Sequence, residues 1–203
     1  MNQPTPPADP LARPRKALVL GAGLAGMLAT AALFGHFDEI TVVDRDRLPE
    51  SARPRKGLPQ ARHAHLLWSG GARAVEALLP GTMDRWLAAG ARRIPLPTGL
   101  VSMSPQGWIR RGPEVQFLIA CSRDLLDWVV RTQVLERPGI TLLHGVETIG
   151  LLGDARRVAG ARVRAAAGGG SVSDLTADLV IDATGRGSQA PKWLAELGLP
   201  TVR

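Results

Sequence analysis

A glycine-rich apolar stretch near the N-terminus constrains this chain more than any other feature. The letters RKALVLGAGLAGMLATAALFG begin with two cations at Arg15 and continue without a charge to Gly35. Such a stretch is typical of a signal peptide or a membrane anchor. It also contains Gly21-x-Gly23-x-x-Gly26, the spacing of a dinucleotide-binding turn. Which of these interpretations holds decides the fold class and most of the function.

The crowding of the glycines favours the dinucleotide-binding turn. Glycine inside a helix costs about 1 kcal/mol relative to alanine, so a spanning helix would gain nothing from three of them. In a strand-turn-helix unit, Gly21 makes the tight turn, Gly23 lets a diphosphate approach the backbone, and Gly26 lets the helix pack on the strand. We expect the strand at 17–20 and the helix from Leu24, whose first amide groups would point at the phosphates.

A second strand that ends in an acid is expected about 20 residues after such a turn. The letters EITVVDRD provide an apolar, β-branched run over 40–43, followed by Asp44 and Arg45. A carboxylate at this position can accept hydrogen bonds from both ribose hydroxyls, and it argues against a 2′-phosphate. The order of elements predicts an α/β fold with a Rossmann-like sheet. It does not distinguish FAD from NAD. The alternatives to a dinucleotide-binding turn are a signal peptide and a chance pattern of glycines.

Composition excludes several other classes of protein. The chain has 203 residues, and its 25 lysines and arginines outnumber its 18 acids, so its surface favours anions. The arginines are scattered and no RNA-binding pattern is present, so we expect no nucleic-acid partner. Cys121 is the only cysteine, which excludes an internal disulfide and a cysteine-based zinc site. Outside the opening stretch, no apolar run approaches the roughly 20 residues that a spanning helix needs. We therefore expect a cytoplasmic protein with no membrane span and no metal.

The remaining pattern predicts one domain after a proline-rich, disordered tail. The tail covers 1–14 and the domain covers 15–203, with substrate-side strands at about 90–120. The expected elements are a helix over 63–80, short antiparallel strands over about 90–120, a helix over 122–137 with Ser122 as its N-cap, a strand over 139–145, a hairpin over 146–165 and a strand over 179–181.

A second glycine-rich turn follows the last of these strands. The letters DLVIDATGRGS lead from the strand into Thr184, Gly185 and Gly187, so the backbone can approach a ligand at the carboxyl end of the strand. An ordinary strand-to-helix turn is the alternative.

Five segments together resemble a known group of enzymes. VLGAGLAG, TVVDRD, KGLPQARHAHLL, SRDLLDWVVR and DLVIDATGRGSQAPKWL look like the N-terminal half of FAD-dependent oxidoreductases related to p-hydroxybenzoate hydroxylase and squalene epoxidase, a group that includes the epoxidases of polyether biosynthesis. The resemblance spans about 15–198. It implies a FAD-binding, Rossmann-like sheet of the glutathione-reductase type with inserted antiparallel strands.

The resemblance also assigns roles to residues. It implies that the three glycines hold the FAD diphosphate, that Asp44 holds the adenosine ribose, and that Arg123 reaches the diphosphate or ribityl chain. Arg62, His63 and His65 would lie close to the cofactor, although a surface charge for Arg123 and a backbone-bonded side chain for either histidine are alternatives. No catalytic residue is identified. The predicted cofactor-binding residues are Gly21, Gly23, Leu24, Gly26, Asp44, Arg45, Arg62, Arg123, Asp182 and Gly185.

Two departures from the group affect the expected function. Its aromatic hydroxylases carry Asp-Gly-x-x-Ser where this chain has Thr184 to Ser188, and Asp182, two residues upstream, is expected to face the opposite way. This departure leaves two sources of electrons open: direct reduction by NAD(P)H, or a separate flavin reductase. The group's later Gly-Asp motif is missing, since GDARRVAG at 153–160 is expected to be a hairpin turn. We therefore expect a fragment truncated at its C-terminus, a split gene product, or a decayed relative of a full-length enzyme.

The function implied is that of a FAD-dependent monooxygenase or epoxidase. It would insert one oxygen atom from O2 into an alkene or aromatic small molecule through a flavin hydroperoxide. One alternative is a FAD-dependent reductase of isoprenoid double bonds, with the same N-terminal half. Another is a non-catalytic nucleotide-binding module that needs a partner, such as the missing C-terminal half.

Overall fold

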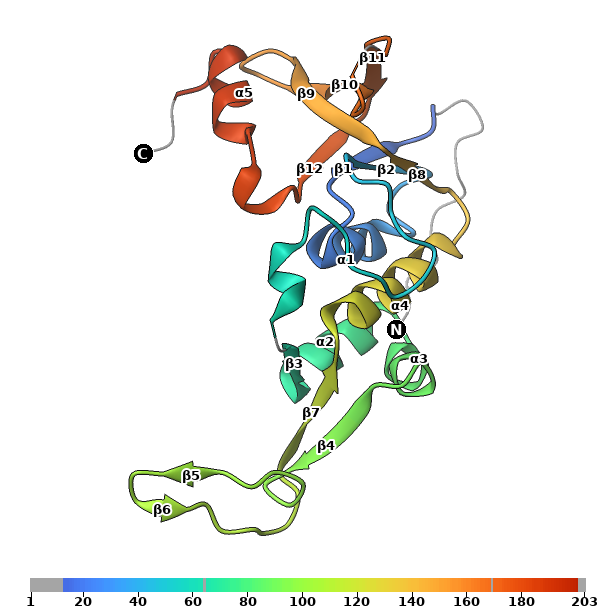
Figure 1. Cartoon of the computed structure of the whole chain (residues 1–203). Coiled ribbons are helices and arrows are strands. Elements are labelled where there is room, and N and C mark those ends of the chain that lie inside the picture. The colour runs from blue at the N-terminus through green and yellow to red at the C-terminus, as the bar shows by residue number, and fades with distance from the viewer. Residues whose placement is uncertain (1–12, 64, 169, 201–203) are drawn as a thin grey trace.

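A parallel four-stranded sheet forms the centre of the computed structural model, which describes residues 13–63, 65–168 and 170–200. Its strands lie in the order β12-β1-β2-β8 (Figure 1), and every neighbouring pair runs parallel. The bounds are β1 (Lys16–Leu20), β2 (Glu39–Asp44), β8 (Ile140–His144) and β12 (Leu179–Asp182). The predicted α/β fold with a Rossmann-like sheet is confirmed.

Side chains of β1 alternate between two hydrophobic cores, as the pleat of a strand requires. Ala17 and Val19 pack in a core with α1 and α4, while Leu18 and Leu20 pack in a second core with Trp193 of α5 and with the antiparallel sheet β11-β10-β9. Figure 1 shows these layers above and below the central sheet. The bounds are α1 (Leu24–Leu33), α4 (Arg123–Leu135), α5 (Ala190–Glu196), β9 (Val146–Gly153), β10 (Val158–Ala165) and β11 (Ser173–Thr176).

The middle of the chain forms a third layer beyond α4. Sheet β3-β7-β4 is antiparallel and packs on α2, and the small hairpin of β5 and β6 projects from its far end (Figure 1). The antiparallel strands predicted at about 90–120 are therefore confirmed. The bounds are β3 (His65–Trp68), α2 (Ser69–Leu78), α3 (Thr82–Ala88), β4 (Arg92–Leu96), β5 (Met103–Ser104), β6 (Gly107–Trp108) and β7 (Gln116–Cys121).

The helix predicted over 63–80 is wrong in its first part. Residues 65–68 form β3, in which Leu66 lies opposite Ala120 and Trp68 opposite Leu118 of β7. The helix begins only at Ser69. A short apolar run is compatible with either a helix or a strand, and here the pairing with β7 makes it a strand. Strand β11 was not predicted, because its polar letters SDLT carry little strand propensity.

The structure describes only the last two residues of the tail predicted over 1–14. Residues 1–12 of the tail predicted over 1–14 lie outside the described residues, while Arg13 forms an ion pair with Asp178. The hairpin predicted over 146–165 is confirmed, because β9 and β10 pair antiparallel and the turn lies between them. Within the described ranges, no helix is long and apolar enough to cross a bilayer.

Helix α4 begins at the predicted cap. The Ser122 side chain accepts a hydrogen bond from the backbone N–H of Leu125 at 3.2 Å. We expect Ser122→Ala to lower the free energy of unfolding by about 1 kcal/mol, since a helix N–H loses its acceptor. Urea denaturation measures this loss. Ser122→Asp keeps an acceptor and should retain the stability, and equal losses in both variants would contradict the capping role.

Candidate nucleotide-binding pocket

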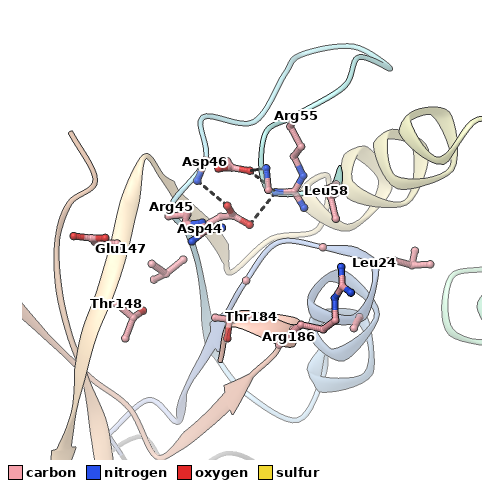
Figure 2. Close-up of a pocket in the computed structure, with 18 of the residues that line it drawn as sticks. Leu24, Asp44, Arg45, Asp46, Arg55, Leu58, Glu147, Thr148, Thr184 and Arg186 are labelled. Carbon is pink, nitrogen blue, oxygen red and sulfur yellow. Dashed lines mark hydrogen bonds and ion pairs between the residues drawn. The ribbon is translucent and has the colours of Figure 1, made fainter. Parts of the chain in front are cut away.

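A cavity of about 640 Å³ lies where β1, β2 and β12 end. Its walls come from the glycine turn, the first turn of α1, the loop after β2, the strand β9 and the turn after β12 (Figure 2). The volume falls within the range of about 300–1,000 Å³ that is usual for cofactor pockets. The carboxyl edge of a parallel sheet is also where open α/β folds bind their ligands.

The glycine turn is fixed by close backbone contacts on two sides. Gly21 has a φ of +100°, and a Cβ there would lie 2.6 Å from the carbonyl oxygen of Ala183. A Cβ on Gly26 would lie 1.8 Å from the carbonyl oxygen of Gly21. Both positions therefore require glycine. Gly26 does not line the cavity. Its lack of a side chain instead lets α1 pack closely against the turn.

The N-terminus of α1 opens into the cavity. Gly23 precedes the first helical residue, and no side chain of the described residues caps this end. Leu24 and Ala25 form part of the wall. Uncapped amide groups and the positive end of the helix dipole together favour an anion here.

Asp44 is enclosed by donors from the protein. Its Oδ2 accepts hydrogen bonds from the N–H of Ala22 at 2.7 Å and from Arg55 at 3.0 Å, and its Oδ1 accepts one from the N–H of Asp46 at 2.8 Å. Only 9% of the side chain is exposed. The carboxylate thus ties the glycine turn to the loop that follows β2.

Arg55 is a pocket residue that the sequence analysis missed. Its side chain is 8% exposed, donates to the carbonyl oxygen of Ala22 at 3.2 Å, and approaches Asp46 at 3.9 Å. Figure 2 shows the guanidinium beside both carboxylates, and one of its nitrogens lies 3.7 Å from where a Cβ on Gly23 would be. No hydrogen-bond partner for its buried Nε exists among the described residues. Loop letters alone do not show which of several arginines folds back to the turn.

Arg123 also lines the cavity, and a buried acid holds it there. Its Nε donates to Oδ1 of Asp127 at 2.6 Å. Burial raises the pKa of Asp127, although the nearby charges of Arg123, Arg55 and Arg131 counteract the shift. The second oxygen of Asp127 is buried and has no hydrogen-bond partner in the described part of the chain. The sequence analysis did not identify this acid as part of the site.

The turn after β12 supplies the opposite wall. Thr184, Gly185 and Arg186 line the cavity (Figure 2). The expectation that Asp182 faces away from position 184 is wrong, because the hydroxyls of Thr184 and Ser188 both donate to its carboxylate. Residues two apart point to the same side of a strand, and the following 3-10 turn over Gly185–Gly187 brings Ser188 back. Asp182 itself does not line the cavity.

The remaining predicted residues lie at different distances from the cavity. Arg45 forms part of its wall (Figure 2), whereas Arg62 lies outside it, at the end of the 3-10 helix over Pro59–Arg62. His63 borders a shallower hollow beside it. The ring of His65 is hydrogen-bonded to the carbonyl oxygen of His63 at 2.7 Å. Among the described residues, no three acids, histidines or cysteines are grouped to hold a metal ion.

No family model matches the chain. Protein Rv3254 of Mycobacterium tuberculosis is 30% identical over 197 residues, which cover 90% of this chain and 40% of that protein. This likeness extends over most of this chain.

Solved structures share the fold. A flavoprotein/dehydrogenase from Cytophaga hutchinsonii matches with a TM-score of 0.64 and 15% identity, over 89% of this chain and 42% of its own. PqsL, a probable FAD-dependent monooxygenase from Pseudomonas aeruginosa, matches with a TM-score of 0.63 and 20% identity, over 92% and 46%. The chain thus has a flavoprotein fold, and it spans less than half the length of each of these relatives.

Proposed function

We propose that this chain binds the ADP part of FAD and belongs to a FAD-dependent monooxygenase. One observation carries the proposal: the glycine turn, the uncapped start of α1 and Asp44 all face a single cavity at the carboxyl edge of the sheet. This arrangement supplies amide donors for a diphosphate and a carboxylate for a ribose. The flavoprotein fold and the resemblance of the five sequence segments support the same assignment.

The donors in the pocket fit a dinucleotide. We propose that Gly23 and Leu24 hold the diphosphate through backbone amides, and that Gly21, whose own N–H donates to the carbonyl oxygen of Val43 at 2.7 Å, contacts it as part of the turn. We propose that Asp44 accepts from the adenosine ribose and that Arg55 and Arg123 neutralise the phosphates. The buried, unpartnered Nε of Arg55 is a donor that a ligand oxygen can satisfy. Arg45 and Gly185 also line the cavity and belong to the proposed contact set. For Arg62, Gly26 and Asp182 we propose a supporting role, since none of them lines it.

The bound cofactor would supply the chemistry of oxygen activation and transfer. The part of the protein described here would bind and orient the cofactor, with an alkene or aromatic small molecule as substrate. We propose a separate flavin reductase or NAD(P)H as the source of electrons. No residue of the described pocket is assigned as a catalytic acid or base.

A titration with FAD tests the proposed cofactor. We expect the purified chain to retain about one FAD per chain after excess cofactor is removed, with a flavin absorbance band near 450 nm, because the residues proposed to contact the ADP part all lie in this chain. Arg45→Gln should weaken binding modestly, whereas Arg156→Gln, on the distant turn between β9 and β10, is a matched control. A chain that takes up neither FAD nor ADP would overturn the proposal.

A nucleotide-binding module that works only in a complex is a second candidate. Large apolar side chains are exposed on the outer part of the third layer, among them Leu66 (55%), Trp68 (51%) and Trp108 (67%). Exposed apolar area of this kind marks surfaces that other protein covers. Tight binding of ADP without retention of the flavin would favour this candidate over the flavoenzyme.

A further inference from the structure

Arg123 reaches the cavity from the first position of α4 with most of its hydrogen-bonding capacity unused. Its side chain is partly buried and lines the cavity. A guanidinium group has five N–H donors, and within the described ranges Arg123 makes a single side-chain hydrogen bond, from Nε to Asp127 at 2.6 Å. The N–H groups of its two terminal nitrogens are therefore available to a ligand.

Asp127 is bonded to Arg123 alone. Arg123 and Arg131 lie four residues before and four residues after it on α4, and side chains at either spacing can meet on a helix. Arg131 instead donates to the carbonyl oxygen of Pro49, and the second oxygen of Asp127 is buried without a partner in the part of the chain that the structure describes. Asp127 does not line the cavity. It can therefore fix the direction of the Arg123 guanidinium without touching a ligand.

The pair of Asp127 and Arg123 is poorly suited to stabilising the fold. A buried carboxylate with one hydrogen-bond donor loses its hydration and recovers only part of that cost, and burial raises the pKa of Asp127. The pair is better suited to ordering a side chain. A free arginine has many rotamers, and a ligand that binds it must restrict them. An arginine that an acid already holds binds the same ligand without that cost.

We propose that Asp127 is a positioning residue, which holds Arg123 by its Nε and leaves the two terminal nitrogens ordered to bind the phosphates of a nucleotide. The preference of the pocket for a ligand with phosphates then depends on an acid that the ligand does not touch. This inference rests on the proposed function of the pocket and adds to it the residue that orders one of its cations.

Asp127→Ala and Asp127→Asn form a matched pair that tests this role. Both remove the negative charge, but asparagine keeps an acceptor for the Nε–H of Arg123. We expect the affinity for ADP, measured by calorimetry on the full chain, to be about fivefold lower in Asp127→Ala than in Asp127→Asn, because binding must then order a free arginine. The affinity for adenosine, which has no phosphate, should be equal in the two variants.

Further variants identify the group through which Asp127 acts. In an Arg123→Gln background, the alanine and asparagine variants should bind ADP equally, because the side chain that Asp127 orders is gone. Asp124 lies on the same helix outside the wall of the cavity, and Asp124→Ala and Asp124→Asn should also bind ADP equally. Without nucleotide, the urea midpoint of Asp127→Asn should equal or exceed that of the unmodified chain, since burial already disfavours the ionised form.

Each remaining outcome has a distinct meaning. If the unmodified chain binds ADP and the two Asp127 variants bind it equally, the positioning role is overturned while the proposed cofactor site stands. The role is also overturned if the difference persists with Arg123→Gln, or if adenosine shows it too, because Asp127 would then act on the pocket as a whole. If the unmodified chain binds neither ADP nor FAD, the proposed function fails and the positioning role fails with it.

Discussion

Replacing Gly26 by alanine is expected to lower the free energy of unfolding by about 3 kcal/mol, the upper end of the usual cost of forcing extra atoms into a packed site. The added Cβ would lie 1.8 Å from the carbonyl oxygen of Gly21, and neither is at the end of a flexible side chain. Helix α1 would have to move away from the turn. Urea denaturation measures the loss, and nucleotide affinity should fall with it.

Gly70 provides the matched control. It lies in α2, and a Cβ there would meet nothing within 4 Å. Gly70→Ala should therefore raise the free energy of unfolding by up to about 1 kcal/mol, because alanine is the better helix former. The same glycine-to-alanine substitution is thus expected to lower the free energy of unfolding in α1 and to raise it in α2. A stable Gly26→Ala variant with unchanged affinity would show that α1 does not need its close approach to the turn.

Asp44→Ala should have the largest effect of a single substitution in the pocket. It leaves Arg55 buried without its closest carboxylate and removes the acceptor for the amides of Ala22 and Asp46. Breaking a buried ion pair by removing one partner costs about 3–5 kcal/mol. We expect a loss of this size in the urea-derived free energy of unfolding, together with loss of nucleotide binding.

The double variant Asp44→Ala, Arg55→Met tests the cause. Removing both charges should recover more than half of the lost stability but none of the nucleotide affinity, since the stranded guanidinium is gone while the ribose acceptor is still missing. Glu39 lies on the same strand in an exposed pair with Lys16. Glu39→Ala should change stability by less than about 1 kcal/mol. Equal losses in Asp44→Ala and Glu39→Ala would refute the buried-pair explanation.

The local signals in the sequence predicted the part of the site that depends on neighbours in the chain. The spacing of Gly21, Gly23 and Gly26 predicted a strand-turn-helix, and the acid that ends β2 predicted Asp44 at its edge, because these positions follow from backbone geometry. Ser122 was identified as a cap for the same reason, since its partner is only three residues away. In the structure, Gly21, Gly23 and Asp44 line one cavity.

The parts that the sequence analysis missed depend on residues far apart in the chain. Arg55 pairs with an acid that precedes it by a long loop, and nothing in the letters RPRKG indicates which arginine folds inward. Asp127 was one of several polar positions on a helix, and only the packing of the loop against α4 buries it. The strand over 65–68 exists because β7 lies beside it. Asp182 was predicted to face away from position 184, although residues two apart on a strand point to the same side.

The pairing of β1 with β12 has a consequence for how the chain is made. Ala17 lies opposite Leu179 in the central sheet, and the carbonyl of Ala183 closes the glycine turn that begins at Gly21. A ribosome must therefore synthesise nearly all of the described chain before the first strand acquires both of its neighbours. Until then, the buried face of β1 is exposed to other unfinished chains, the condition in which aggregation competes with folding. The nucleotide pocket is accordingly among the last features that a growing chain can complete.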